Sequence, residues 1–340
     1  MKLPTPNWWY VRAGTRAPVV RALLRPVSWV WAAVTARRIA RTVPFDPGVP
    51  VICVGGLTVG GAGKTPVAQA LLRRLAAQGI AVAGLSRGYG GRLAGPVRVD
   101  PALHTAADVG DEPLMLAAEA PVWISRDRAA GARAAAADGA QVLVLDDGHQ
   151  NPSVLKTLSL VVVDGETRRG EWPFGDGAVF PSGPMREPLA VGLARADAVI
   201  VMLPADLEAP DPELLALFAG KTVLIARLES VGAPPPGPQV AFAGIAKPWR
   251  FEQALKAASC DMADFAPLPD HAAFDEPTLT FLADRAEALG AGLVTTEKDW
   301  VRLPPAWRER VACWPVRARF EDEGMLDHLL FPVILGRSEA

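Results

Sequence analysis

The stretch VICVGGLTVGGAGKTP, residues 51–66, decides the fold of this 340-residue chain. Its first four residues, 51–54, are apolar and end in two glycines, which predicts a short buried strand. A glycine-rich loop follows over residues 58–65, and apolar residues then recur at helical spacing over residues 66–78. Strand, glycine-rich loop and helix in this order are typical of a loop whose backbone N–H groups bind phosphate oxygens at a helix N-terminus.

The residue types within the loop indicate a nucleotide site rather than a plain turn. Lys64 has the place of the lysine that reaches the outer phosphates, and the Thr65 hydroxyl has the place of a Mg²⁺ ligand. Thr58 stands where the usual pattern has its first glycine. The residues expected to hold the nucleotide are Thr58, Val59, Gly60, Gly61, Ala62, Gly63, Lys64 and Thr65.

A second predicted strand ends in two carboxylates, in the stretch VLVLDD at residues 142–147. Phosphate-loop enzymes place an acidic residue at such a strand end to hold Mg²⁺. Adjacent like charges repel unless a cation offsets them, so Asp146 and Asp147 favour a metal site over an exposed polar turn.

Further strands and helices alternate along the chain, which predicts an α/β fold with a doubly wound sheet of the phosphate-loop NTPase type. Functional sites in such sheets lie beyond the carboxyl ends of the strands. A stiff GAPPPGP stretch at 232–238 separates this sheet from a second, smaller α/β unit. The expected divisions are an amphipathic helical segment over 1–44, a phosphate-loop domain over 45–230 and a smaller α/β domain over 231–340.

The leading segment is basic and aromatic. Residues 1–45 hold eight Lys and Arg and no acidic residue, while apolar residues between Val20 and Val34 recur at three- and four-residue steps. Pro18 and Pro26 predict two shorter helices. Contact with a membrane surface and simple packing on the domain are both compatible with this pattern. The strongest apolar run, Val27–Val34, is too short to span a bilayer, so no spanning segment is expected.

Composition excludes several classes of protein. Of the 35 Lys and Arg, the 27 outside the leading segment face 37 Asp and Glu, which argues against nucleic-acid binding by the body of the chain. The three cysteines form no C-x-x-C pair, which favours a reducing cytosol over a disulfide framework. No obligate protein partner is indicated.

Several other residues are ambiguous by themselves. Asp111 and Glu112 lie beside a glycine and a proline, and His271 follows Asp270 in an apparent loop. The Gly- and Pro-rich stretch 172–188 predicts a long loop, and such loops in compact domains are often functional.

Taken together, an ordered set of motifs resembles the tetraacyldisaccharide 4'-kinase family. The motifs are GGLTVGGAGKTP (55–66), SRGYG (86–90), GDEP (110–113), DDGHQ (146–150), PMREP (184–188), DH (270–271) and TTEKD (295–299). The family has a serine or threonine where Thr58 stands, and an aromatic residue where this chain has His149.

The resemblance implies an enzyme that uses ATP and Mg²⁺ to phosphorylate the 4'-hydroxyl of the lipid A disaccharide 1-phosphate, giving lipid IVA. It also implies a peripheral location at the cytoplasmic face of the inner membrane of Gram-negative bacteria, with the leading segment as the docking surface.

The resemblance further assigns roles to particular residues. Asp111 and His271 are the expected catalytic pair, with Lys64 as the main phosphate contact. The expected metal ligands are Thr65 and Asp146, with Glu112 and Asp147 as further contributors. The expected acceptor contacts are Arg186, Glu187, Arg87 and Tyr89.

Because His271 lies in the second unit, closure of the two units on ATP is expected to complete the site. The main alternative is a membrane-associated nucleotide switch of the ParA/MinD kind. Such switches carry a lysine just before the paired glycines, where this chain has Val59.

Overall fold

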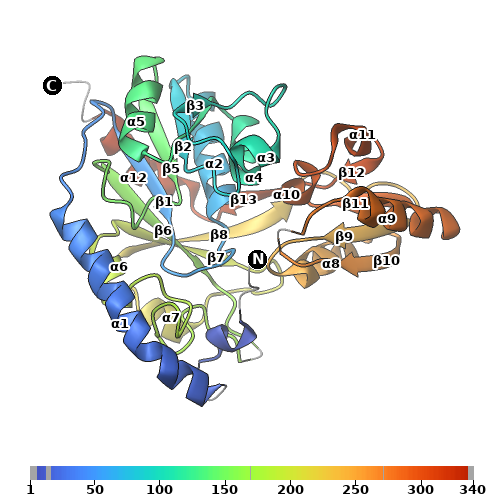
Figure 1. Cartoon of the computed structure of the whole chain (residues 1–340), viewed down its shortest axis with the longest axis horizontal. Helices are drawn as coiled ribbons and strands as arrows, with labels where there is room; N and C mark the ends of the chain where they lie inside the picture. Colours follow the sequence, from blue (N-terminus) through green and yellow to red (C-terminus); the bar gives the residue numbers. More distant parts are fainter. Residues whose placement is uncertain (1–5, 13–16, 169, 271, 336–340) are drawn as a thin grey trace.

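The computed structural model describes residues 6–12, 17–168, 170–270 and 272–335. Two α/β units lie beside each other, and a long helix, α1 (Pro18–Arg41), runs along one side of the larger unit (Figure 1). The short 3-10 helix η1 (Asn7–Tyr10) precedes α1.

The larger unit is built on a nine-stranded sheet in the order β13-β8-β7-β6-β1-β5-β2-β4-β3. Neighbours are parallel except at the two edges, where β13 and β3 run antiparallel. The strands are β1 (Val51–Gly55), β2 (Val82–Ser86), β3 (Val97–Arg98), β4 (Val122–Ile124), β5 (Val142–Asp146), β6 (Leu158–Asp164), β7 (Ala198–Leu203), β8 (Thr222–Ser230) and β13 (Val316–Phe320). The phosphate-loop type of doubly wound fold is therefore confirmed.

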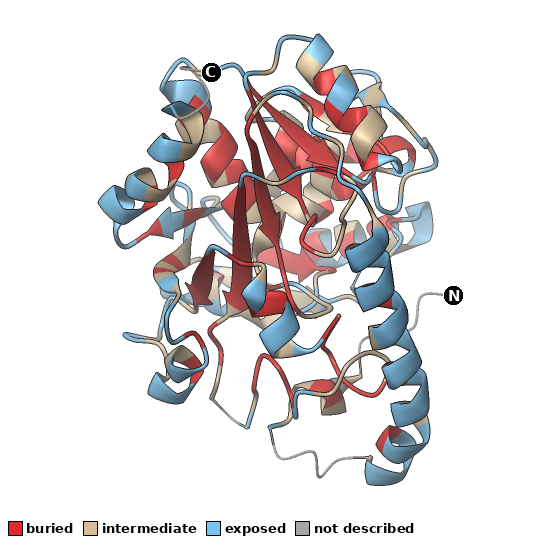
Figure 2. Ribbon diagram, turned by 90° about the vertical axis from the view of Figure 1, so that its left-hand side faces the viewer, coloured by how far each residue is buried: buried red, intermediate tan, exposed pale blue. Residues whose placement is uncertain are grey.

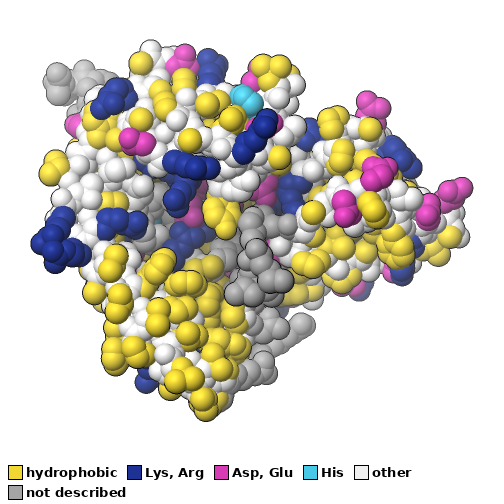
Figure 3. Space-filling model, in the orientation of Figure 1, with side chains coloured by type: hydrophobic (Ala, Val, Ile, Leu, Met, Phe, Trp, Pro, Cys, Tyr) yellow, Lys and Arg dark blue, Asp and Glu magenta, His cyan; other side chains and the backbone are white. Residues whose placement is uncertain are grey.

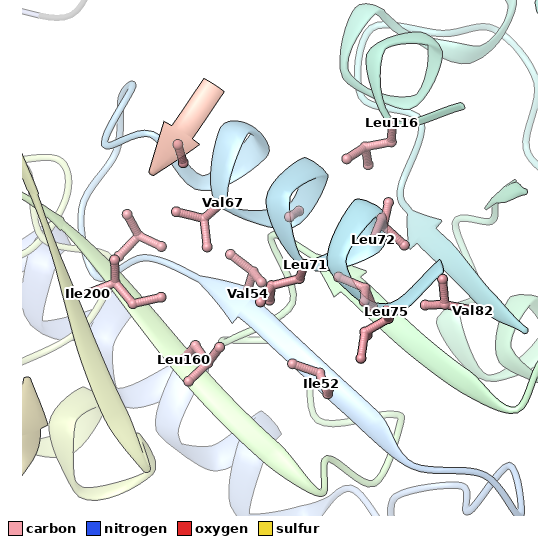
Figure 4. Close-up of a cluster of buried hydrophobic side chains, with 14 of the residues drawn as sticks. Ile52, Val54, Val67, Leu71, Leu72, Leu75, Val82, Leu116, Leu160 and Ile200 are labelled. Carbon is pink, nitrogen blue, oxygen red and sulfur yellow. The ribbon is translucent and has the colours of Figure 1, made fainter. Parts of the chain in front are cut away.

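Helices cover both faces of this sheet because successive strand residues point to opposite sides. On β1, Ile52 and Val54 face α2, α4 and α12, whereas Val51 and Cys53 face α5. Figure 4 shows the first of these layers, with Leu71 and Leu75 of α2 packed on Ile52 and Val54. The helices of the larger unit are α2 (Lys64–Ala77), α3 (Ala106–Val109), α4 (Asp111–Ala117), α5 (Arg128–Ala137), α6 (Leu189–Ala194), α7 (Pro212–Ala216) and α12 (Glu323–Leu335).

The smaller unit is a parallel four-stranded sheet in the order β10-β9-β11-β12. Helix α9 covers one face and α8 the other. Its elements are β9 (Gln239–Ala243), α8 (Pro248–Ala257), β10 (Met262–Pro267), α9 (Glu276–Ala288), β11 (Gly292–Thr295), α10 (Glu297–Trp300), α11 (Pro305–Arg308) and β12 (Val311–Cys313).

The chain returns to the larger unit at its end. Strand β13 pairs with β8, and Leu326 and Leu330 of α12 are buried in the core that contains α2. The predicted division, 231–340, groups this last segment with the smaller unit, because one pairing strand and one apolar helix do not reveal locally which sheet they join.

The prediction of two short helices in the leading segment is wrong, because α1 is one helix of 24 residues. Pro18 lies at its start, where proline is favoured, and Pro26 lies inside it on an exposed side. An internal proline removes one backbone hydrogen bond without always ending a helix.

By length and composition, α1 is also the one helix among the described residues that is long and apolar enough to cross a membrane. The prediction of no spanning segment rests on the uninterrupted apolar run Val27–Val34 alone, whereas the whole helix is longer. In the structure α1 lies along the larger unit and is exposed over most of its length (Figure 2).

Candidate active site

The candidate site lies at the carboxyl edge of the large sheet, where β1, β5 and β2 end. Strand β1 leads into the phosphate-type loop, and β5, its neighbour in the sheet, ends at Asp146. Strand β2, which pairs with β5 on the other side, ends just before Arg87. The parallel register therefore collects residues that lie far apart in the sequence.

The loop has the conformation that its glycines predict. Gly60 and Gly63 have φ angles of +111° and +90°, and α2 begins at Lys64. The Lys64 ammonium lies 3.4 Å from the Gly60 carbonyl oxygen and 3.9 Å from Asp147 Oδ1. It thus lies across the loop, where the phosphates of a nucleotide bind in this kind of site.

Asp146 is a buried carboxylate at the end of β5. Neither of its oxygens has a hydrogen-bond partner among the described residues. Burial raises the pKa of Asp146 well above its usual value, and the negative charges of Glu112 and Asp147 raise it further. A buried, unpartnered carboxylate is unfavourable unless something positive binds it, so this position fits a cation ligand.

Asp147 is ionised more readily than its neighbour. Its φ of +50° directs it away from the strand path, and Arg186 Nη1 donates to its Oδ1 at 2.6 Å. Although burial opposes ionisation, Lys64 and Arg186 together hold the pKa of Asp147 below its usual range.

Arg186 and Glu187 belong to one hydrogen-bonded network. Arg186 Nε donates to the Thr58 carbonyl at 3.0 Å, so this arginine links the loop to Asp147. Glu187 is buried and accepts from Arg195 at 2.6 and 2.7 Å and from Gln150 Nε2 at 2.9 Å. Hydrogen bonds within the protein therefore hold both side chains next to the loop.

Asp111 and Glu112 open helix α4 after Gly110. Both lie in the site: the Asp111 side chain is buried, and its Oδ1 accepts from the Glu112 amide at 3.1 Å. Burial raises the pKa of Glu112 despite the nearby ammonium groups of Lys298 and Lys64, while Asp111 and Asp147 add to the rise. Glu112 and Asp146 therefore both lie within electrostatic reach of Lys64.

The loop that carries Arg87 and Tyr89 follows β2, and both side chains are exposed. It lies against the turn before α4, since a β-carbon at Gly110 would lie 2.5 Å from the Tyr89 carbonyl oxygen. His271, the expected partner of Asp111, lies outside the described residues.

His149, whose role the sequence left open, is a buried neutral residue beneath the loop. Its ring nitrogens lie 3.0 Å from Ser159 Oγ and 2.9 Å from the Gly192 carbonyl oxygen. Burial lowers the pKa of His149 to about 4. It therefore joins β6 to α6 behind the site by hydrogen bonds. The aromatic residue that the family has at this position can join them by packing.

Two site residues received no role from the sequence. Gln150 donates to the Gly56 carbonyl at 2.9 Å, and Lys298 of the smaller unit is close enough to lower the pKa of Glu112. Both lie in motifs that carry the family resemblance, at 146–150 and 295–299. The motifs mark their positions in the sequence, but only the tertiary structure shows which residues Gln150 and Lys298 lie near.

Known proteins share this whole architecture. A family model described as tetraacyldisaccharide-1-P 4'-kinase matches residues 20–334. Proteins named tetraacyldisaccharide 4'-kinase from Phenylobacterium zucineum and Caulobacter vibrioides are 69% and 68% identical to this chain. These alignments cover 96% and 97% of this chain and 98% of each relative.

The fold agrees with a solved structure as well. The LpxK protein of Aquifex aeolicus, solved in complex with ATP, superimposes with a TM-score of 0.73 at 25% identity. The superposition covers 93% of this chain and 99% of that one. Because these likenesses extend over nearly the full length rather than over the phosphate-type loop alone, the nucleotide-switch alternative is set aside, and the chain belongs to the tetraacyldisaccharide 4'-kinase family.

Proposed function

We propose that this chain transfers the γ-phosphate of ATP to the 4'-hydroxyl of tetraacyldisaccharide 1-phosphate, the lipid A precursor, to give lipid IVA. The observation that carries this is the unpartnered, buried carboxylate of Asp146 beside a phosphate-type loop whose lysine is in place. Family membership supplies the acceptor, and the ATP bound by the Aquifex relative supplies the donor.

The residues present fit a Mg²⁺ ion. Thr65 and Asp146 would hold it, with Glu112 and Asp147 as further oxygen donors, and the ion would neutralise charge on the phosphates. Among the described residues no three His, Cys, Asp or Glu side chains gather as a metal site. A phosphate-loop site does not need such a group, because phosphates and water complete the coordination.

Asp111 is proposed to accept the proton of the sugar hydroxyl, oriented by His271. Support for this role comes from its position at the start of α4, next to Glu112, which lies within electrostatic reach of Lys64. Lys64 neutralises charge as the phosphate moves, and alignment with charge stabilisation supplies most of the rate enhancement in this chemistry.

The acceptor contacts are proposed to come from two places. Arg87 and Tyr89 present exposed side chains next to the turn before Asp111, which suits recognition of a sugar phosphate. The second place is the loop, where Asp147 holds Arg186. Glu187 is held by Arg195 and accepts from Gln150, which in turn accepts from Arg186. Glu187 therefore acts through Gln150 and Arg186 rather than by direct contact with the acceptor.

Helix α1 is proposed to dock on the cytoplasmic face of the inner membrane, where a four-chain lipid can be reached. A helix packed on a domain usually buries its apolar side, whereas α1 buries polar residues and exposes apolar ones. The buried residues are Arg21, Ser28 and Thr35, whereas the apolar Val19, Leu23, Val27, Val30 and Val34 face outward. Figure 3 shows hydrophobic side chains gathered over α1, with Lys and Arg at its C-terminal end. Such a surface suits an anionic lipid interface.

The test is transfer of labelled γ-phosphate from ATP to tetraacyldisaccharide 1-phosphate in mixed micelles. We expect Lys64→Ala and Asp111→Ala each to lower the rate by about 10²-fold or more, since each removes a group acting in the transition state. Lys256→Ala, at an exposed lysine paired with Glu252 on α8, is the matched control and should keep the wild-type rate.

Lipid product that depends on Lys64 and Asp111 but not on Lys256 would establish the reaction. Nucleotide binding without any lipid product would contradict it.

A further inference from the structure

Tyr10 of the leading segment reaches the phosphate-type loop, although 49 positions separate it from Val59. Its hydroxyl donates a hydrogen bond to the Val59 carbonyl oxygen. It also lies directly beside the next residue, because a β-carbon at Gly60 would be 2.7 Å from the Tyr10 oxygen. No motif in the sequence points to a role for Tyr10 in nucleotide binding.

The main chain around Tyr10 is fixed to the body of the larger unit. The Trp172 amide donates to the Tyr10 carbonyl at 2.7 Å, and Val11 bridges to Glu171. The guanidinium of Arg12 lies 4.2 Å from the centre of the Trp172 ring. The hydroxyl is therefore held in place from outside the loop it contacts.

The peptide groups that flank Val59 are held from two sides. The Val59 amide donates to the Pro184 carbonyl at 2.8 Å, while its carbonyl accepts from Tyr10. Residues 182–186 are themselves attached to α1: the Ser182 amide donates to Ser28 Oγ at 3.1 Å, and Trp31 Nε1 donates to the Arg186 carbonyl at 3.2 Å. The leading segment thus supports the loop directly through Tyr10 and indirectly through α1.

We infer that Tyr10 is a positioning residue of the nucleotide site. Gly60, with φ at +111°, has the conformational freedom of a glycine, and ordering it on binding costs conformational entropy. A hydrogen bond to the preceding carbonyl fixes the peptide plane between Val59 and Gly60, so the Gly60 amide is already aimed when the phosphates arrive. The inference rests on the proposed use of this loop for ATP.

The experiment compares Tyr10→Phe, which removes only the hydroxyl, with the wild-type full chain. The dissociation constant of a non-hydrolysable ATP analogue with Mg²⁺ is measured by calorimetry. Loss of one ordinary hydrogen bond predicts binding weaker by about threefold to tenfold. The KM for the lipid acceptor should stay at the wild-type value, and the melting temperature should fall by no more than about 4 °C, the shift expected for one hydrogen bond.

Glu213→Gln is the matched control, because it removes the exposed ion pair of the same segment without touching the loop or the contact between Arg12 and Trp172. A second measurement, hydrogen exchange of the peptide that covers residues 57–63 in the nucleotide-free chain, should show faster exchange in Tyr10→Phe only. Unchanged affinity and exchange in Tyr10→Phe would overturn the inference, as would equal losses in both variants. Failure of the wild-type chain to bind the analogue would instead refute the proposed function, and the inference with it.

Discussion

At the scale of single residues, the site combines two carboxylates that adjoin in sequence but differ in environment. Asp147 is bonded to Arg186, whereas Asp146 is buried with both oxygens unpartnered. Their pKa values move in opposite directions for this reason. The nucleotide-free chain therefore carries a local destabilisation at Asp146, of the kind that functional sites impose on a fold.

We expect Asp146→Asn to raise the free energy of unfolding of the nucleotide-free chain by roughly 1–3 kcal/mol at pH 8, because it removes a buried, unpartnered charge. A carboxyl whose pKa is raised in the folded state binds its proton more tightly there than in the unfolded chain. The wild type thus loses stability as the pH rises from about 4 through that raised pKa. The variant, which has no such proton, should lack this loss.

Urea denaturation at pH 5 and pH 8 measures both effects. Asp147→Asn is the control of opposite sign, since its carboxylate is already paired with Arg186 and its loss should destabilise the fold. An Asp146→Asn chain no more stable than the wild type at pH 8 would show that the buried carboxylate does not destabilise the folded chain.

At the scale of elements, α1 shows that periodicity identifies a face without saying where that face points. The apolar spacing predicted one helical side correctly, but in the structure this side faces outward. Helix propensity also outweighed Pro26, so the two expected helices are one. The helix is held by its polar side, where the buried Arg21 pairs with Asp176 and donates to the Trp8 carbonyl at 2.5 Å.

We expect the triple variant Leu23→Ser, Val27→Ser, Val30→Ser to bind anionic vesicles at least about tenfold more weakly than the wild type. Each of these side chains is more than half exposed, and burying each in lipid is worth about 1.5–3 kcal/mol. Transfer to acceptor in vesicles should fall in parallel, whereas affinity for ATP should not.

Vesicle sedimentation and the transfer assay measure the two effects. The control is Phe281→Ser with Leu289→Ser, which removes exposed apolar side chains from the smaller unit. If the triple variant sedimented with vesicles as the wild type does, α1 would not be the docking surface.

At the scale of the whole molecule, the two units are joined by ion pairs next to the site. Asp164, at the end of β6, accepts from Arg250 at 2.8 Å and pairs with Lys247 at 3.1 Å, both of which belong to the smaller unit. Although burial opposes ionisation, these two cations lower the pKa of Asp164. The smaller unit also brings Glu297 within 3.4 Å of Gln69 on α2.

We expect Asp164→Asn to loosen this junction, giving a larger radius of gyration and separate thermal transitions for the two units. A carboxyl with a lowered pKa contributes stability above its unfolded value of 3.8 and loses it as the pH falls below that. The wild type should therefore keep its compact scattering profile from neutral pH down to about pH 4.

Solution scattering and calorimetry measure this, with Glu252→Gln as the control, since it breaks an ion pair within α8 alone. One unchanged transition in Asp164→Asn would mean that other contacts hold the units together. The same scattering measurement with and without an ATP analogue tests the predicted closure of the units.

The sequence by itself determined the strand, loop and helix of the nucleotide site and the carboxylates at the end of β5. These features depend on the order of neighbouring residues and on residue types that few other local structures require. Only the tertiary structure decided that Arg186 binds Asp147, that Tyr10 reaches Val59, that β13 joins β8 and that the apolar side of α1 faces outward. The physical reason is that these features depend on contacts between segments that lie from 39 to 155 residues apart. Their formation depends on the register of the sheets and the packing of the layers, which leave no periodic signal in the chain.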